Sequence, residues 1–307
     1  MLKGYFAHHS LFGQILLLLI FIFSGMILFT GIGVALAAAI YSISPEEVLN
    51  TFAHLHEGGG REIFKLVQGL NTIGTYLIPG IIGALMFSKE PEGMIGVDSF
   101  PRPAWLILIA LTAAAYSMGA LSDLLYRMST AFPWPESISA NFTQIQEVML
   151  GTYENILNIQ GPVDFVQVLL VMAVLPAIAE ETLFRGLIQP LLRRHLNPHL
   201  AILITSAVFS LLHQQYLAFL SIFVLGALLG YLREWSNSIW PSTILHFFNN
   251  ASIVVLVYYF DYDYRQALSS DMGINWTETL VLLAILSVSI LLLHNLFAKN
   301  RRWISSK

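Results

Sequence analysis

Three ionisable side chains lie within six positions of the chain, at the end of a run of apolar residues. Glu180, Glu181 and Arg185 follow the stretch 166–178, which otherwise has the composition of a transmembrane helix. A charge at the centre of a bilayer costs about 2.5 to 3.5 kcal/mol on insertion scales. Charged residues in such a position are therefore expected to have a function.

Helical geometry separates the roles of the two carboxylates. Residues four apart lie on one face of a helix, while adjacent residues are about 100° apart. Glu181 therefore reaches Arg185, and this pair alone fits equally well with an ion pair that stabilises a helix end. Glu180 has no basic residue at helical spacing nearby. It is the carboxylate that a structural ion pair does not explain.

The composition is that of a polytopic membrane protein. Of the 307 residues, 56% are hydrophobic and 11% are charged, and the mean hydropathy is +0.69. We expect a single all-α integral membrane domain over residues 1–307 rather than two soluble domains. The formal net charge of -4 does not favour nucleic acid as a partner. Because the chain has no cysteine, it has no disulfide, thiolate nucleophile or cysteine-ligated metal.

Apolar runs predict a bundle of about eight transmembrane helices. The fifth run is shorter than the roughly 20 residues of a full crossing, so we expect it to tilt or to end where His213 faces a cavity. Pro176 predicts a kink in the fourth run. Residues 42–68 predict an exposed polar loop that has room for a short helix. Residues 127–162 predict an amphipathic helix, either on the membrane or as an ordinary packed loop helix. The expected spans are residues 11–41, 70–87, 104–126, 164–181, 200–212, 217–232, 239–260 and 277–297.

The distribution of charge predicts the orientation. We place the N-terminus in the cytoplasm, together with the segments that follow the second, fourth, sixth and eighth spans. This side then holds 11 of the 15 basic residues: Lys3, Lys89, Arg102, Arg185, Arg193, Arg194, Arg233, Lys299, Arg301, Arg302 and Lys307. The other side holds 13 of the 19 acidic residues. This follows the positive-inside rule with both termini cytoplasmic and the acidic motif toward the cytoplasmic end of its helix. Compact loops and the lack of an organelle signal favour a prokaryotic plasma membrane.

Two further polar clusters lie in apolar runs. Phe209 and His213 close the fifth expected span, and His246, Asn249 and Asn250 lie within the seventh. His246 and Asn250 are four residues apart and share a helix face, whereas Asn249 is turned away by about 100°. A single histidine in such a place is more often a hydrogen-bonded bundle residue than a catalyst. Two carboxylates, two imidazoles and a carboxamide on three apolar helices favour a catalytic site.

These motifs resemble those of the CPBP intramembrane proteases, also called the Abi or CAAX-protease family, which includes the CAAX prenyl endopeptidases of the Rce1 type. They occur in the family's order, each on an expected helix, and the resemblance covers about residues 164–258, which we expect to be the catalytic core. The matching motifs are EExxxR at Glu180, Glu181 and Arg185, FxxxH at Phe209 and His213, and HxxxN at His246 and Asn250.

The resemblance implies a glutamate-dependent endopeptidase in a membrane cavity open to the cytoplasm. An apolar bundle disfavours the charged form of a glutamate, which raises its proton affinity toward the range useful to a general base. The expected partners are the lipid bilayer and a peptide or protein substrate, lipidated or not. The implied roles are general base for Glu180, holding and polarising the water for His213, stabilising the oxyanion for His246 and Asn250, and orienting the helix for Glu181 and Arg185.

Other functions use the same residue types. Two histidines and one glutamate also hold Zn²⁺ with a bound water that hydrolyses amides, and such ligands could converge from three helices without an HExxH motif. Because the family resemblance points to metal-free catalysis, we expect no cofactor, with zinc as the alternative. A proton-coupled transporter would place Glu, His and Asn in the membrane but should show inverted repeats, which we do not find. The intact motifs argue against a non-catalytic scaffold or immunity protein.

Overall fold

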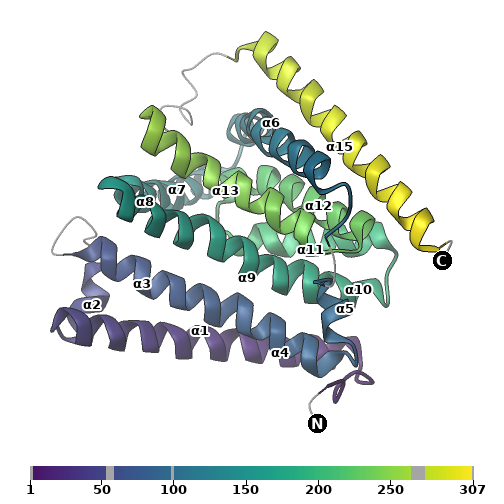
Figure 1. The fold of residues 1–307 in the computed structure, drawn as a ribbon. Helices are drawn as coiled ribbons and strands as arrows, with labels where there is room; N and C mark the ends of the chain where they lie inside the picture. The colour runs from purple at the N-terminus through teal and green to yellow at the C-terminus, as the bar shows by residue number, and fades with distance from the viewer. Residues whose placement is uncertain (1–2, 53–58, 98–99, 264–273, 306–307) are drawn as a thin grey trace. The chain divides into compact units, whose positions relative to one another are not determined.

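The structure is a computed structural model that describes residues 3–52, 59–97, 100–263 and 274–305 (Figure 1). These residues form helices and no strand, which confirms the all-helical membrane fold. A helix pairs its backbone N–H and C=O groups internally, as hydrocarbon surroundings require. In this part of the chain, seven helical runs are long and apolar enough to cross a membrane: Leu11–Tyr41, Gly60–Phe87, Ala104–Ala131, Gly161–Arg193, Tyr216–Ser236, Trp240–Phe260 and Trp276–Ala298.

The fifth predicted span is the short apolar helix α11 (Pro198–Leu212), with 15 residues. At 1.5 Å per residue it is about 22 Å long, less than the roughly 30 Å of a hydrocarbon core. Asn197 caps its N-terminus by accepting a hydrogen bond from the N–H of Leu200 at 2.9 Å. At the other end Gln214 has a left-handed conformation, with φ of 57°. Both ends are thus defined by local chain geometry.

The chain divides into two compact units, one of residues 1–95 and 151–187 and the other of residues 96–150 and 188–307. The first contains α1 (Leu11–Tyr41), α2 (Pro45–Thr51), α3 (Gly60–Thr72), the π turn η1 (Ile73–Leu77), α4 (Ile78–Phe87), α5 (Pro91–Ile95), α8 (Gly161–Leu169), the π turn η2 (Leu170–Val174), α9 (Leu175–Leu183) and most of the π turn η3 (Phe184–Ile188). The second contains α6 (Ala104–Ala131), most of α7 (Glu136–Leu157), α10 (Gln189–Arg193), α11, the 3₁₀ turn η4 (Tyr216–Ala218), α12 (Phe219–Ser236), α13 (Trp240–Phe260) and α15 (Trp276–Ser305).

In the first unit, α3 starts earlier than the sequence suggested. The predicted polar stretch 42–68 contains the short helix α2, and α3 begins at Gly60 rather than at the expected start of the second span at residue 70, because this stretch is an amphipathic helix. Its apolar face buries Ile63 and Val67 against Val34 and Ala37 of α1. Packing of these side chains outweighs the polar composition of the segment.

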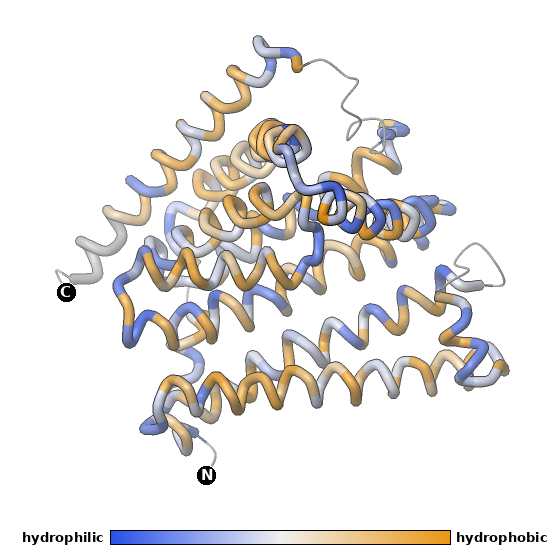
Figure 2. The backbone as a smooth tube through the Cα atoms, turned by 180° about the vertical axis from the view of Figure 1, so that it is seen from behind, coloured by the Kyte–Doolittle hydropathy of each residue, from blue (hydrophilic) through white to orange (hydrophobic). Residues whose placement is uncertain are grey.

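The opposite face of α1 is exposed over most of its length in the described part of the chain. Only 6% of its most apolar 18-residue window is buried, and Figure 2 shows hydrophobic residues along the helix. A large exposed apolar surface of this kind is suited to contact with lipid tails.

In the second unit, four long helices share one hydrophobic core. α15 packs along α6 (Figure 1), and both contact α12. The core contains Leu111 of α6, Leu229 of α12, Leu245 of α13 and Leu293 of α15, all with side chains buried. The amphipathic helix predicted between residues 127 and 162 is present as α7, and its position at a membrane surface stays a prediction.

Glycine residues allow α4 to approach the helix that carries the acidic motif. A Cβ atom added at Gly80 would lie 3.0 Å from Cγ2 of Thr182 and 3.1 Å from the backbone N of Leu183. One added at Gly83 would lie 2.3 Å from Cδ2 of Leu187. Small residues at such positions let helix backbones come close in membranes. We call this contact the glycine seam.

We expect Gly80→Ala to destabilise the protein by about 1 to 3 kcal/mol, the usual range for overpacking. The reason is that the backbone of Leu183 cannot move aside as a flexible side chain can. Unfolding of the purified protein in detergent measures the change. Gly31→Ala in α1 is the matched control, since a Cβ there meets nothing within 4 Å. Equal losses in both variants would show that the seam is not responsible.

Candidate active site

The acidic motif lies in the middle of one long helical run, Gly161–Arg193. The sequence placed the end of this span at Glu181, but the helix continues because the following residues Leu183, Phe184 and Leu187 are apolar and buried. Where a kink was expected at Pro176, the structure has the π turn η2, which ends just before α9 begins. π turns inside helices often occur at functional sites.

Glu181 and Arg185 form the ion pair that their spacing predicts. Nη1 of Arg185 donates to Oε1 of Glu181 at 2.9 Å, and both side chains are 0% exposed. A charged pair so completely removed from solvent has a strong mutual attraction but also a large desolvation penalty. Its side chains are fixed in place. Glu180 is only partly buried, so it is the more accessible of the two carboxylates.

His213 caps the end of α11 with its own side chain. Its ring nitrogen Nδ1 lies 2.7 Å from the carbonyl oxygen of Phe209. A carbonyl oxygen only accepts, so Nδ1 must carry the proton. In the neutral ring Nε2 is then the nitrogen that can accept a proton from water.

Phe209 brings the two predicted histidines together. Its ring centroid lies 4.4 Å from that of His213 and 5.8 Å from that of His246, the second contact being edge to face. Phe209 and His246 are both buried, while His213 is partly exposed. The aromatic residue of the FxxxH motif thus has a physical role, because it contacts the imidazoles of two different helices.

Asn250 lies one turn after His246 on α13, as the HxxxN spacing predicts. Its side-chain oxygen accepts a hydrogen bond from Nδ2 of Asn249 at 3.2 Å. That bond orients the carboxamide of Asn250 so that its NH₂ group points away from Asn249.

The predicted residues therefore fall into two sets. The first unit holds Glu180, Glu181 and Arg185, and the second holds Phe209, His213, His246 and Asn250. Among the described residues, no group of three or more His, Asp or Glu side chains forms a metal-binding cluster.

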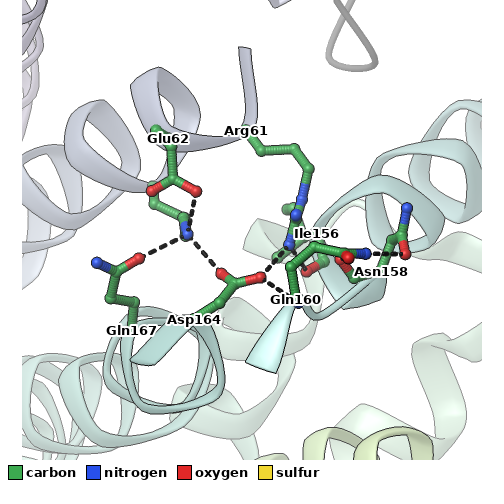
Figure 3. Close-up of polar contacts among 8 residues, drawn as sticks. Arg61, Glu62, Ile156, Asn158, Gln160, Asp164 and Gln167 are labelled. Carbon is green, nitrogen blue, oxygen red and sulfur yellow. Dashed lines mark hydrogen bonds and ion pairs between the residues drawn. The ribbon is translucent and has the colours of Figure 1, made fainter. Parts of the chain in front are cut away.

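A charged network that no sequence pattern indicated fixes the start of the motif-bearing helix to α3 (Figure 3). Nζ of Lys65 donates to Oδ1 of Asp164 at 2.6 Å, and Nη2 of Arg61 donates to Oδ2 of the same carboxylate at 2.9 Å. Further bonds join Lys65 to Glu62 and Gln167, Arg61 to the carbonyl of Ile156, and the N–H of Gln160 to Asp164. Two cations face two anions, so the network is neutral. The sequence signal was two basic residues on an expected outer segment and an acid at the first position of the fourth expected span.

Comparison with known families then adds a second line of evidence. Residues 162–252 match the family described as Rce1-like, type II CAAX prenyl endopeptidase. We call residues 162–252 the Rce1-like segment, after the family that they resemble. The Rce1-like segment contains every residue of the EExxxR, FxxxH and HxxxN motifs and includes parts of both units. No curated protein and no solved structure matches the chain.

Proposed function

We propose that the protein is an intramembrane endopeptidase that hydrolyses a peptide bond with a glutamate-activated water. The observation that carries the proposal is that all three motifs lie inside the Rce1-like segment, on or at the end of apolar helices, two of which are long enough to cross a membrane. The match and the apolar helices support a CAAX-type membrane protease. The roles of individual residues and the cytoplasmic opening of the cavity are our inference.

In the proposed reaction, Glu180 takes a proton from water while the water oxygen attacks the carbonyl carbon of the substrate. His213 accepts a hydrogen bond from that water and orients it. The C–N bond then breaks as Glu180 returns the proton to the departing amine nitrogen. Such general-base help typically contributes about 10²- to 10⁴-fold in rate.

The tetrahedral intermediate carries a negative oxygen that needs hydrogen-bond donors. We assign this role to His246 and to the NH₂ group of Asn250, which lie one helical turn apart. Each preorganised donor of this kind contributes about 2.7 to 4 kcal/mol of transition-state stabilisation. The proposal requires Glu180 of the first unit and the residues of the second to act on one substrate.

The buried pair of Glu181 and Arg185 has a supporting role in this proposal. It places a fixed charge pair directly after Glu180 in the chain and so restricts the helix that presents the base. Metal-free catalysis is part of the proposal.

We propose a membrane location with both termini in the cytoplasm, in a prokaryotic plasma membrane. The orientation depends on α11. If α11 crosses together with the seven longer helical runs, the chain makes eight crossings and its ends lie on one side. Seven crossings would put the ends on opposite sides. The excess of Lys and Arg on one side of the eight-span arrangement favours eight crossings, with both ends of the chain on the cytoplasmic side.

A direct test uses the purified full-length protein in lipid vesicles and two peptides that differ in one modification. One ends in a prenylated cysteine followed by three residues, and the other has the same sequence without the prenyl group. We expect the first peptide to be cleaved, with mass spectrometry identifying the bond, and the rate to be unchanged after incubation with strong chelators. Loss of activity on chelation with recovery on adding Zn²⁺ would instead support the metal-dependent alternative. If neither peptide were cleaved, the result would contradict a CAAX-type specificity.

A further inference from the structure

Two adjacent asparagines lie in the middle of α13, a helix that is long and apolar enough to cross a membrane. Asn249 follows His246 by three residues and Asn250 by four. Both spacings make the side chain a neighbour of the imidazole on the helix surface, one turn further along. His246 is buried and both asparagines are partly buried. The two carboxamides therefore lie beside the imidazole that we assign to the oxyanion.

The hydrogen bond between the asparagines has a direction. Consecutive side chains point about 100° apart on a helix, yet these two reach each other, with 3.2 Å between the donor Nδ2 of Asn249 and the acceptor Oδ1 of Asn250. A carboxamide has one donor end and one acceptor end. Because the acceptor end of Asn250 faces Asn249, its NH₂ group lies on the side away from Asn249.

The opposite direction would have a different chemical consequence. If Asn250 donated to Asn249, the carboxamide of Asn250 would be rotated by half a turn, and its oxygen would take the place of its NH₂ group. An oxygen in that place would repel the negative oxygen of a tetrahedral intermediate, whereas an NH₂ group stabilises it. The direction of this bond therefore decides whether Asn250 can act as an oxyanion donor.

The bond also affects the strength of that donor. Hydrogen bonds between side chains contribute little to the stability of membrane helices on average. Hydrogen bonds in a chain nevertheless polarise one another. A bond accepted by Oδ1 of Asn250 draws electrons from the nitrogen of the same carboxamide, which makes its NH₂ group a better donor.

We propose that Asn249 is a positioning residue for Asn250. Its NH₂ group holds Oδ1 of Asn250 and keeps the NH₂ group of Asn250 directed away, where it can donate to the oxyanion. The inference rests on the proposed peptidase function, in which Asn250 is such a donor. Asn249 occupies a position that the HxxxN motif leaves unspecified.

The test uses Asn249→Asp, which reverses the direction of the bond with almost no change of shape. An ionised carboxylate only accepts, so the carboxamide of Asn250 must rotate and donate to it. With the prenylated peptide, in lipid vesicles at about pH 8, we expect kcat to fall about tenfold or more with little change in KM. The reason is that a hydrogen bond to a charged acceptor changes the balance between two orientations by about that factor.

A second variant, Asn249→Leu, removes the bond without imposing the opposite orientation. The two orientations of the Asn250 carboxamide then become about equally populated, and we expect kcat to fall only about twofold. Ser252→Ala is the matched control on the same helix. Its Oγ donates to the backbone carbonyl of Asn249 at 2.6 Å and not to the side chain, so its kinetics should be unchanged.

A double variant separates reorientation from simple charge repulsion. If Asp at position 249 acts by turning Asn250, then Asn249→Asp should cause no further loss of kcat in a protein that already carries Asn250→Ala. If the new charge repelled the oxyanion directly, its effect would persist in that background.

A further measurement does not depend on activity. In protein labelled with ¹³C-asparagine, the Cγ resonance of Asn250 is identified by its loss in Asn250→Ala. A carbonyl carbon moves upfield when its oxygen loses a hydrogen-bond donor. We therefore expect this resonance to move upfield in both Asn249 variants and to stay in place in Ser252→Ala.

Two results would overturn the role of Asn249. One is an Asn250 Cγ resonance that does not move in Asn249→Asp. The other is a loss of kcat in Asn249→Asp that persists in full beside Asn250→Ala. If the wild-type protein cleaved neither peptide, the proposed reaction would be refuted, whereas the Cγ resonance would still decide whether Asn249 orients Asn250. The two failures are thus distinguishable.

Discussion

Glu180→Gln is expected to lower the rate of peptide cleavage by about 10²- to 10⁴-fold while the protein inserts and folds normally. Glutamine has nearly the same size as glutamate but cannot take a proton from water, so only the chemical step is lost. The effect should appear in kcat, because the amide still occupies the space of the carboxylate. Single-turnover measurement of product with purified protein separates this step from substrate binding.

Two control variants test whether the loss of activity is specific to Glu180. Glu181→Gln should retain part of the activity, because that carboxylate is paired with Arg185 and does not touch water in the proposed reaction. Glu46→Gln in α2, an exposed carboxylate, should be fully active. Full activity of Glu180→Gln would remove the proposed base, and equal losses in the Glu180 and Glu181 variants would show that the motif acts through folding alone. A comparison of peptide termini in membranes containing wild-type protein or Glu180→Gln would then reveal natural substrates.

Arg185→Met is expected to lower the free energy of unfolding by about 3 to 5 kcal/mol, more than Gly80→Ala or Arg127→Met. The guanidinium and its partner Glu181 are both 0% exposed, so the substitution leaves a carboxylate in the interior without its cation. The double variant Glu181→Gln with Arg185→Met should recover much of this loss, because it leaves no buried charge at either position. Reversible unfolding in mixed micelles gives the free energies for a double-mutant cycle.

The pair of Asp123 and Arg127 provides a matched control for this experiment. It has the same spacing of four residues and a similar distance of 2.9 Å, but its side chains are 37% and 20% exposed. We expect Arg127→Met to cost only about 0 to 1 kcal/mol, the usual value of an exposed pair. If both arginine variants lost the same amount, burial would not be the cause, and the interpretation of the Glu181 pair would be wrong.

Much of the fold followed from hydropathy and helical spacing. The apolar runs gave the membrane helices, and the spacing of Glu181 and Arg185 gave their ion pair, because both depend on interactions local in the chain. The start of α3 was expected ten residues too late, since the segment from Gly60 is rich in polar residues, and the packing of Ile63 and Val67 against α1 stabilises it as a helix. Similarly, no local pattern marks Asp164 as the partner of Lys65, 99 residues earlier in the chain.

In the candidate site, too, features set by neighbouring residues in the sequence were predictable, whereas contacts between distant residues were not. The three motifs were visible because residue types that are costly in a bilayer stand out in an apolar sequence. The contact of Phe209 with His246 depends on how α11 and α13 lie in the second unit, which the sequence does not specify directly. The π turn η2 before α9 was also not predictable, because it inserts one residue into a helical repeat without a characteristic residue type.

The length of α11 has a consequence for the surrounding lipid. If α11 crosses the membrane, as the proposed orientation requires, a helix about 8 Å shorter than the hydrocarbon core would create a hydrophobic mismatch, which the bilayer would relieve by thinning beside it. Thinning draws headgroups and their hydration toward the end of the helix, where His213 is partly exposed. The proposed peptidase would consume water at every turnover, and a thinned annulus next to α11 would supply it without a permanent channel through the protein.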